Sequence, residues 1–369
     1  MPLRLAEPVA SRDPALAYRD DLAGAAQRAM AASPPSVHDL RLGGAHVRLR
    51  LAGPALEPVL LPALAHGLIE RTAEMPDLRI DAWDSESTGI GPPAFPWRPE
   101  DVRERGEIRG FNEGAVRTLY QVGGPGAGRD FQAISVVDTA RGEAWFVVAS
   151  GHCVPWYERA APLRAVLHLG LHRSTRLLVH AAALGHERAG MLLAGAAGSG
   201  KSTTAMACVL AGLGYAGDDY VVVDVGDEQL RAHSLYGTAK LAPSSTSLLP
   251  ELACRFPAVA GTDGEKLVVD LAGSFPAQMR PAVALSTIVV PSVRPGLSQP
   301  RLARCSAATA LRALAPTTIH QLPSVGGSAL APLAALVRRV PAYTLELGGS
   351  PHAAATALTS LLEELGDAA

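Results

Sequence analysis

The sequence predicts an α/β protein in which a mixed sheet with flanking helices follows a smaller, β-rich α+β domain. Three observations lead to this prediction. The chain has 369 residues, a length that suits two domains at about 150 residues each, or one large domain with an extension. Its first half contains mostly short strand patterns, whereas apolar strands and helices alternate in its second half, as in α/β layer architectures. We place the first domain at residues 1–155 and the second at residues 160–369.

The first domain is predicted to open with a helix whose apolar residues recur at near-helical spacing until Pro34 and Pro35 end the pattern. Two strand patterns then flank Gly43 and Gly44, which indicates a hairpin. Residues 89–128 are rich in Pro and Gly and are expected to be mostly loop. The predicted elements are a helix at 14–32 and strands at 37–42, 46–51, 78–83, 131–137 and 145–149.

The second domain shows longer apolar runs separated by turns and helical patterns. Two of these runs flank a polar turn at residues 185–190, which indicates another hairpin, and a helix follows directly. The predicted helices lie at 162–172, 203–213, 331–339 and 352–365, and the predicted strands at 176–184, 191–194, 284–290 and 342–347.

Composition and charge exclude several classes of protein. Hydrophobic residues make up 48% and charged residues 18%, which is typical of folded globular chains. A net charge of −2 gives no broad attraction to nucleic acid or anionic lipid. No apolar run reaches about 18 residues and the N-terminus lacks a signal core, so we expect a cytoplasmic protein without a membrane partner. The oligomeric state, including a homo-oligomer, stays open.

The cysteines and lysines give two further expectations. Cys153, Cys208, Cys254 and Cys305 are too far apart for a zinc or redox motif, so we expect them to be reduced core residues. The chain has thirty arginines but only three lysines, Lys201, Lys240 and Lys266. Against such a bias a retained lysine can be chemically required, although for Lys240 and Lys266 simple persistence is an equal alternative.

A glycine-rich motif at residues 195–202 is the strongest chemical signal in the chain. Its sequence fits G-x-x-x-x-G-K-[ST] and lies between an apolar strand and a helix, which is the context of a phosphate-binding loop. In such a loop backbone N–H groups surround phosphate oxygens, Lys201 reaches the β- and γ-phosphates, and Ser202 can ligate Mg²⁺. The predicted nucleotide-binding residues are Gly195, Ala196, Ala197, Gly198, Ser199, Gly200, Lys201, Ser202 and Thr203.

A nucleotide-dependent enzyme also needs a carboxylate near the phosphates, and the sequence offers the pair Asp218-Asp219 or the isolated Asp224. The helix after Ser202 carries the chain about 17 Å away at 1.5 Å per residue. Six extended residues from Gly214 to Asp219 span about 20 Å, enough to return. We therefore favour the pair over Asp224, with a simple turn between two strands as the alternative.

His180 is placed near the same loop by the register of the second hairpin. If the hairpin tip lies between Glu187 and Arg188, His180 faces Gly195 at the mouth of the loop. A slip of one residue would turn its side chain to the other face of the sheet. A buried core histidine without a function is the alternative.

These features together resemble the kinase domain of bacterial HPr kinase/phosphorylase. The resemblance rests on His180 followed by three alanines, on the loop from Gly195 to Thr203, and on Gly217-Asp218-Asp219-Tyr220 shortly after Lys201. It covers roughly residues 176–293 and looks most like the divergent branch that modifies peptides, including kinases that phosphorylate a serine of lasso-peptide precursors.

The resemblance implies roles for individual residues. Lys201 would hold the transferred phosphate, Ser202 and Asp218 the metal, and Asp219 would accept the proton of the acceptor hydroxyl, with Asp218 in support. His180 matches the family histidine near the phosphates. The family's further glutamate ligand would fall at residues 235–240, where this chain has no acid, and its arginine-rich signature is not recognisable. The reverse, dephosphorylating reaction and HPr as substrate are therefore not expected.

The expected function is ATP-dependent phosphorylation, with Mg²⁺, of a Ser or Thr hydroxyl of a peptide or protein, such as a biosynthetic precursor peptide. The N-terminal domain would bind this acceptor. Two alternatives stay open, a small-molecule kinase and a non-catalytic ATP-binding regulatory module. Nothing in the sequence identifies the acceptor.

Overall fold

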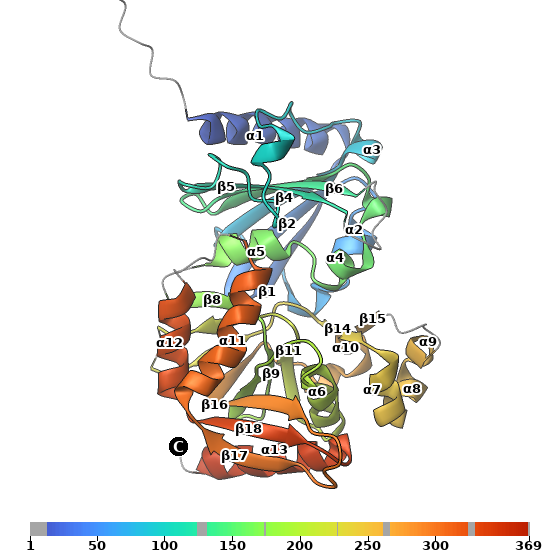
Figure 1. Cartoon of the computed structure of the whole chain (residues 1–369). Coiled ribbons are helices and arrows are strands. Elements are labelled where there is room, and N and C mark those ends of the chain that lie inside the picture. The colour runs from blue at the N-terminus through green and yellow to red at the C-terminus, as the bar shows by residue number, and fades with distance from the viewer. Residues whose placement is uncertain are drawn as a thin grey trace, which may run out of the picture.

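The computed structural model describes residues 13–123, 131–172, 175–226, 228–260, 266–323 and 329–367. These residues form a seven-stranded sheet, a nine-stranded sheet and a two-stranded ribbon, with helices packed on both large sheets (Figure 1). The predicted α/β class with mixed sheets and flanking helices is confirmed. In the part of the chain that the structure covers, no helix has both the length and the apolar character that crossing a bilayer requires.

The seven-stranded sheet belongs to the N-terminal half, in the order β3-β1-β2-β4-β7-β6-β5. The predicted hairpin is present, and Gly43 and Gly44 both adopt the positive φ that its tight turn needs. Because successive side chains face opposite sides of a strand, Trp83 packs in a cluster with α1 while Ala82 packs in the cluster that contains α5. The strands are β1 (Ser36–Leu42), β2 (Ala45–Ala52), β3 (Leu68–Ile69), β4 (Leu78–Asp84), β5 (Val116–Val122), β6 (Gln132–Asp138) and β7 (Glu143–Val148).

The expectation of mostly loop is confirmed for residues 89–115, which contain turns and one 3₁₀ turn, but the sequence missed β5, which follows them. Residues 124–128 are outside the described residues. β5 is the edge strand beside β6, and Arg117 and Gln121 on it are only partly buried. Its apolar pattern is therefore weaker than that of a central strand.

The nine-stranded sheet belongs to the C-terminal half and is mixed. β10 lies between β9, which is antiparallel to it, and β16, which is parallel. The path β11-β9-β10-β16-β13-β12-β8 is extended by β18 beside β16 and β17 beside β18, and β14 pairs with β15 as a separate ribbon. The strands are β8 (Arg176–Val179), β9 (Ala182–Gly185), β10 (Gly190–Leu193), β11 (Gly214–Gly217), β12 (Val221–Asp224), β13 (Arg231–His233), β14 (Thr238–Leu241), β15 (Leu267–Asp270), β16 (Ala282–Val293), β17 (Arg301–Cys305) and β18 (Ala342–Leu347).

The predicted single strand over residues 176–184 is wrong, because the chain divides it into β8 and β9 at His180 and Ala181. β8 pairs with β12, whereas β9 pairs with β10 and β11. The backbone N–H of His180 donates to Thr318 Oγ1 of α11 at 3.1 Å, so the break leaves this buried donor satisfied. The register of the hairpin is as predicted, with Gly190 facing Gly185 and Leu193 facing Ala182.

Helices cover both faces of the nine-stranded sheet. Leu184, Met191 and Leu193 pack in one cluster with α6 and α13. Ala183 and Leu192, on the opposite face, pack in the cluster that contains α11 and α12. The helices are α1 (Pro14–Ala32), α2 (Glu57–Leu60), α3 (Ser85–Thr88), α4 (Trp156–Ala160), α5 (Arg164–Leu171), α6 (Lys201–Leu210), α7 (Pro243–Leu248), α8 (Pro250–Arg255), α9 (Pro257–Ala260), α10 (Leu271–Ser274), α11 (Ala307–Gln321), α12 (Leu330–Arg339) and α13 (Pro351–Asp367), with short 3₁₀ turns at Ala65–Gly67, Pro99–Asp101, Gly151–Cys153 and Pro276–Gln278.

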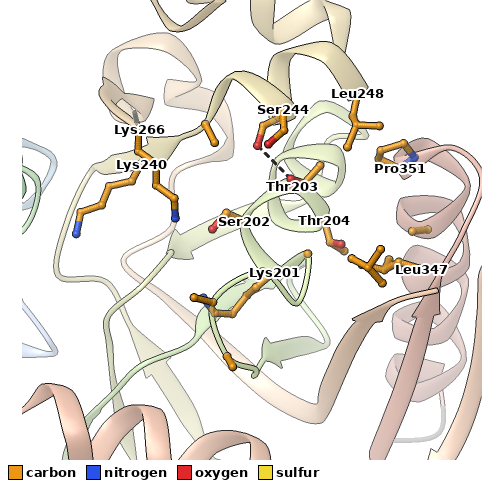
Figure 2. Close-up of a pocket in the computed structure, with 18 of the residues that line it drawn as sticks. Lys201, Ser202, Thr203, Thr204, Lys240, Ser244, Leu248, Lys266, Leu347 and Pro351 are labelled. Atoms are coloured by element: carbon orange, nitrogen blue, oxygen red, sulfur yellow. Dashed lines mark hydrogen bonds between the residues drawn. The ribbon is translucent and has the colours of Figure 1, made fainter. Parts of the chain in front are cut away.

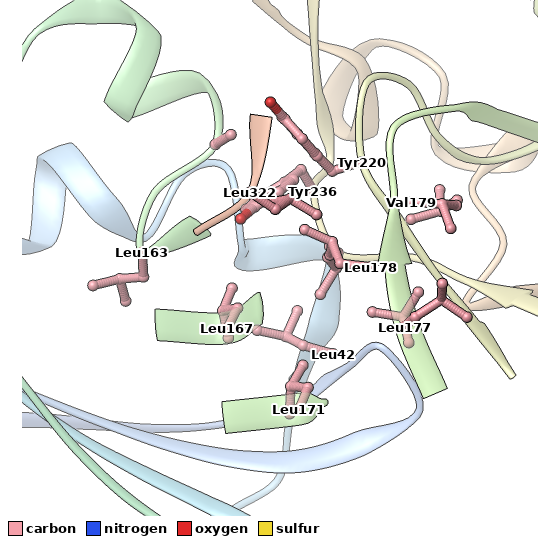
Figure 3. Packing of buried hydrophobic residues seen from close by; sticks show 14 of the residues in the cluster. Leu42, Leu163, Leu167, Leu171, Leu177, Leu178, Val179, Tyr220, Tyr236 and Leu322 are labelled. Atoms are coloured by element: carbon pink, nitrogen blue, oxygen red, sulfur yellow. The ribbon is translucent and has the colours of Figure 1, made fainter. Parts of the chain in front are cut away.

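One hydrophobic cluster joins the two halves. Figure 3 shows Leu42 of β1, Leu167 and Leu171 of α5, and Leu177 and Leu178 of β8 within it, and all five are buried. The backbone N–H of Gly43 also donates to the carbonyl of Ser234 at 2.8 Å. The two sheets are thus packed on a common core, and the division near residues 155–160 stays a prediction.

The four cysteines are free, but they are not all core residues as expected. Cys208 of α6 is buried, Cys153 and Cys305 are half-buried, and Cys254 is exposed. Cys254 lies on the short helix α8, where the apolar side chain that packs inward is Leu252.

Candidate active site

The glycine-rich loop connects β10 to α6, as the sequence predicts. Gly198 and Gly200 have φ of 79° and 92°, a backbone conformation that favours glycine. A Cβ atom built on Gly200 would come within 2.3 Å of the Leu347 side chain, so the loop is also packed tightly. Lys201 is the first residue of α6 and is buried. The N–H groups that begin α6 therefore face the same space as the loop.

This space is a cavity of about 760 Å³. Figure 2 shows Lys201 and Ser202 at its centre, Lys240 and Lys266 on one side, and Leu248, Leu347 and Pro351 on the other. Most of the predicted site residues line it, namely His180, Ala196, Ala197, Gly198, Gly200, Lys201, Ser202, Thr203 and Asp219. Gly195, Ser199 and Asp218 are not among its lining residues, although the chain places each next to one that is.

Asp219 is the centre of a charged cluster in this cavity. Its Oδ1 lies 3.5 Å from Nε2 of His180 and 3.8 Å from Nζ of Lys201, and its Oδ2 lies 3.5 Å from Nζ of Lys240. Its φ of 68° is left-handed, which a short polar side chain tolerates better than most. Burial alone would raise the pKa of the Asp219 carboxyl, but the contact with His180 and the charges of Lys240 and Lys201 outweigh it and hold the pKa well below the usual range.

The low pKa of Asp219 leads to a prediction about stability. Asp219 is ionised at neutral pH, and replacing it by Asn would leave three basic groups facing one another. A carboxyl whose pKa is lowered by folding stabilises the protein above its unfolded pKa of about 3.9, and this stabilisation is lost as the pH falls toward the folded pKa. We therefore expect Asp219→Asn to lower the free energy of unfolding at pH 7, and the difference from wild type to shrink below about pH 4. Denaturant titrations at several pH values measure this difference, and a difference independent of pH would contradict the low pKa.

Asp218 is placed differently from Asp219. It is buried, and its Oδ1 accepts a hydrogen bond of 2.9 Å from the backbone N–H of Asp219. This bond constrains the left-handed turn that presents Asp219 to the cavity. The geometry thus gives Asp218 a supporting contact, while its predicted role as a metal ligand stays a prediction.

Asp224 lies away from the cavity, at the far end of β12 from Asp219. Its Oδ2 accepts from Nε of Arg176 at 2.5 Å, and its Oδ1 accepts from the N–H of Gly226 at 3.0 Å. β11 brings the chain back to the site and β12 leads away, as the geometric argument predicts.

We expect Asp224→Asn to leave nucleotide-dependent activity unchanged, because this side chain does not line the cavity. Stability should fall by about 1–2 kcal/mol, since the ion pair with Arg176 is lost while the amide can still accept the other hydrogen bond. Thermal unfolding and phosphotransfer measured on the same preparation test this. A loss of activity as severe as that of Asp219→Asn would show that Asp224 belongs to the site.

The structure adds residues that the sequence did not assign. All three lysines of the chain line the cavity, so Lys240 and Lys266 join Lys201 there. The Nζ of Lys240 lies 6.0 Å from the ring centroid of Trp156, at the start of α4. The rarity of lysine was the one signal in the sequence that pointed to Lys240 and Lys266.

Beside His180, three side chains that line the cavity are joined by hydrogen bonds. The Tyr220 ring lies 5.5 Å from the His180 ring. Its hydroxyl accepts from Arg164 at 2.8 Å and donates to Oε1 of Gln321 at 2.5 Å. Arg164, Tyr220 and Gln321 come from α5, the Asp-Asp turn and α11, so no local pattern could place them together.

The side-chain oxygen atoms around the cavity suit a metal ion that enters the site already bound to phosphate. No group of three His, Cys, Asp or Glu side chains that could hold a metal ion occurs among the described residues. Mg²⁺ does not need such a group, because it is commonly held by one or two protein oxygens together with substrate phosphates. The hydroxyl of Ser202 and the carboxylate of Asp219 line the cavity and are oxygen donors of this kind.

Comparisons with known proteins leave the family open. No family model and no curated protein matches the chain. Among solved structures, the Hpr(Ser) kinase/phosphatase from Coxiella burnetii matches with 12% identity and a TM-score of 0.28, over 51% of this chain and 88% of that chain. That structure bears the name of the family that the motifs resemble, but a likeness this distant establishes neither membership nor activity.

Proposed function

We propose that this protein is a kinase that transfers the γ-phosphate of ATP to a hydroxyl group of a peptide or protein. One observation carries the proposal. A carboxylate, Asp219, lies within 3.8 Å of the lysine of the glycine-rich loop and within 3.5 Å of His180, inside a cavity large enough for a nucleotide. Binding alone does not need this carboxylate, whereas transfer to a hydroxyl does.

The two ends of the cavity suggest how the substrates would be oriented. Apolar side chains gather beyond the glycine-rich loop and would contact a nucleobase, among them Leu248, Val293, Leu297 and Leu347. The opposite side of the cavity is polar, and we call it the polar end. Asp219, His180, Lys240 and Lys266 lie there. The acceptor hydroxyl would therefore enter at the polar end and the phosphates would lie between the two substrates.

In the proposed reaction the acceptor oxygen attacks the γ-phosphorus, the bond from that phosphorus to the bridging oxygen breaks, and ADP leaves. The hydroxyl proton passes to Asp219 as the new bond to phosphorus forms, because this bond makes the proton on the acceptor oxygen acidic enough for a carboxylate of low pKa to accept it. His180 orients this carboxylate through its Nε2. Lys201 neutralises charge on the phosphates during transfer. Mg²⁺ bound with ATP would add neutralising charge, with Ser202 as the protein residue that holds it.

Incubation of the purified protein with γ-labelled ATP and candidate peptides tests the proposal. Label transfer to a Ser or Thr hydroxyl, dependent on the peptide, is the expected result. Transfer to a small molecule alone would indicate the small-molecule kinase, and nucleotide binding without any transfer would indicate the regulatory module.

A further inference from the structure

Lys240 is the residue whose position the proposed reaction does not yet explain. It lies in β14, and its side chain is 17% exposed, so it is held in the wall of the cavity. It contacts Oδ2 of Asp219, whereas Lys201 and His180 contact Oδ1. The two lysines thus approach the carboxylate at different oxygens, and only Lys201 belongs to the glycine-rich loop.

The side chains around Lys240 suit the positive charge of its ammonium group. Its ammonium faces the ring of Trp156, whose negative face attracts cations. Glu158, on the same short helix, is the other nearby acid, but burial raises the pKa of its carboxyl in spite of Arg164 and Lys240. Glu158 does not line the cavity, so it does not face a ligand bound there.

The polar end has more positive than negative charge. Asp219 is the only acidic side chain among the residues that line the cavity in the described part of the chain. Lys240, Lys266 and Arg164 line it at or near this end, in addition to Lys201. Once Lys201 contacts the nucleotide phosphates, Asp219 can balance only one of the remaining cations. A ligand that brings a negative charge to this end would reduce the excess of positive charge.

We propose that the acceptor carries a negatively charged group, a carboxylate or a phosphate, close to the hydroxyl that is phosphorylated, and that Lys240 binds this group. The inference rests on the proposed kinase function and names the chemical class of its acceptor. Trp156 and the Asp219 carboxylate hold the ammonium in place before the acceptor arrives, so little ordering is needed on binding. An acidic side chain of a peptide and the carboxylate of a small hydroxy acid share this chemistry.

The test compares acceptors that differ only in charge. One pair is a Ser peptide with neighbouring Glu residues and the same peptide with Gln; the other is glycerate and glycerol. In one of the two pairs, we expect the wild-type KM for the charged acceptor to be about tenfold to a hundredfold lower than the KM for its neutral partner. This factor corresponds to the free energy of one hydrogen bond to a charged group. A preference in the peptide pair identifies a peptide as the source of the charge, and a preference in the other pair identifies a small molecule. No preference in either pair would overturn the proposal.

Lys240→Met should abolish this preference in KM while the KM for ATP and the KM for the neutral acceptors stay unchanged. Because Lys240 also contacts Asp219, kcat should change in this variant, and by the same factor for charged and neutral acceptors. Arg338→Met, which removes an exposed charge from α12 away from the cavity, is the matched control and should keep the preference. Retention of the KM preference by folded Lys240→Met would contradict the proposal.

A binding measurement separates this inference from the proposed function. Fluorescence anisotropy of the labelled Glu peptide needs no turnover and uses the full chain with ADP. If no acceptor is phosphorylated, the kinase proposal fails, and weaker peptide binding by Lys240→Met than by Arg338→Met would still support the anion site. If transfer occurs but the two variants bind the Glu peptide and glycerate equally well, the kinase stands and the anion site is refuted.

Discussion

Lys201→Ala is expected to lower phosphotransfer by at least about 10²–10³-fold, the loss typical when one preorganised charge-stabilising donor is removed. Lys201 is buried at the start of α6 and is aimed into the cavity, 3.8 Å from Asp219. Without its charge, negative charge that develops on the leaving ADP is not neutralised. Rates with γ-labelled ATP and saturating acceptor give the size of the loss.

The fold should survive this substitution. Alanine is favourable in a helix, and the buried face of α6 is made by other residues, among them Met206 and Val209. Near-unchanged thermal unfolding, together with Arg338→Met as the control for loss of a positive charge, would separate a chemical effect from misfolding. Retention of full activity in folded Lys201→Ala would end the assignment of the loop as a phosphate site.

The sequence predicted the parts of the site that depend on local geometry. The glycine-rich loop, the return of the chain at Asp219, and the departure of β12 toward Asp224 follow from spacing and from the rise per residue of helices and strands. The hairpin register followed from the polar turn between β9 and β10. Each of these depends on residues close together in the chain, where steric rules leave few alternatives.

The remaining parts depend on contacts between distant segments. The break at His180 lies in a continuous apolar run, because both β8 and β9 are buried on both faces, and the backbone partner that makes it possible is Thr318 of α11. α11 itself contains Pro316, and because proline is unfavourable inside a helix, the sequence of this segment does not predict one. Lys240 lies on β14, which pairs with β15, and its contact with Asp219 joins segments that are not adjacent to the glycine-rich loop in sequence.

Asp219→Asn is expected to lower turnover by about 10²–10⁴-fold, the usual range for loss of a general base. The amide keeps the size of the carboxyl and can still accept a hydrogen bond, but it cannot take the hydroxyl proton. Asn is also a suitable replacement for the backbone, since after glycine Asn and Asp are the residues that best tolerate the φ of 68° found here. A loss of activity in this variant is therefore not explained by a distorted turn.

Nucleotide binding distinguishes the two roles that the geometry allows for Asp219. If Asp219 is the base, the affinity for Mg·ATP should change far less than the rate, because Lys201 and the glycine-rich loop remain. The variant removes one negative charge beside three basic groups, so ATP binding could even strengthen. Calorimetric titration of wild type, Asp219→Asn and Asp224→Asn with Mg·ATP measures this. Loss of binding in Asp219→Asn alone, with the protein still folded, would identify this carboxylate as a metal ligand and move the base role to Asp218 or His180.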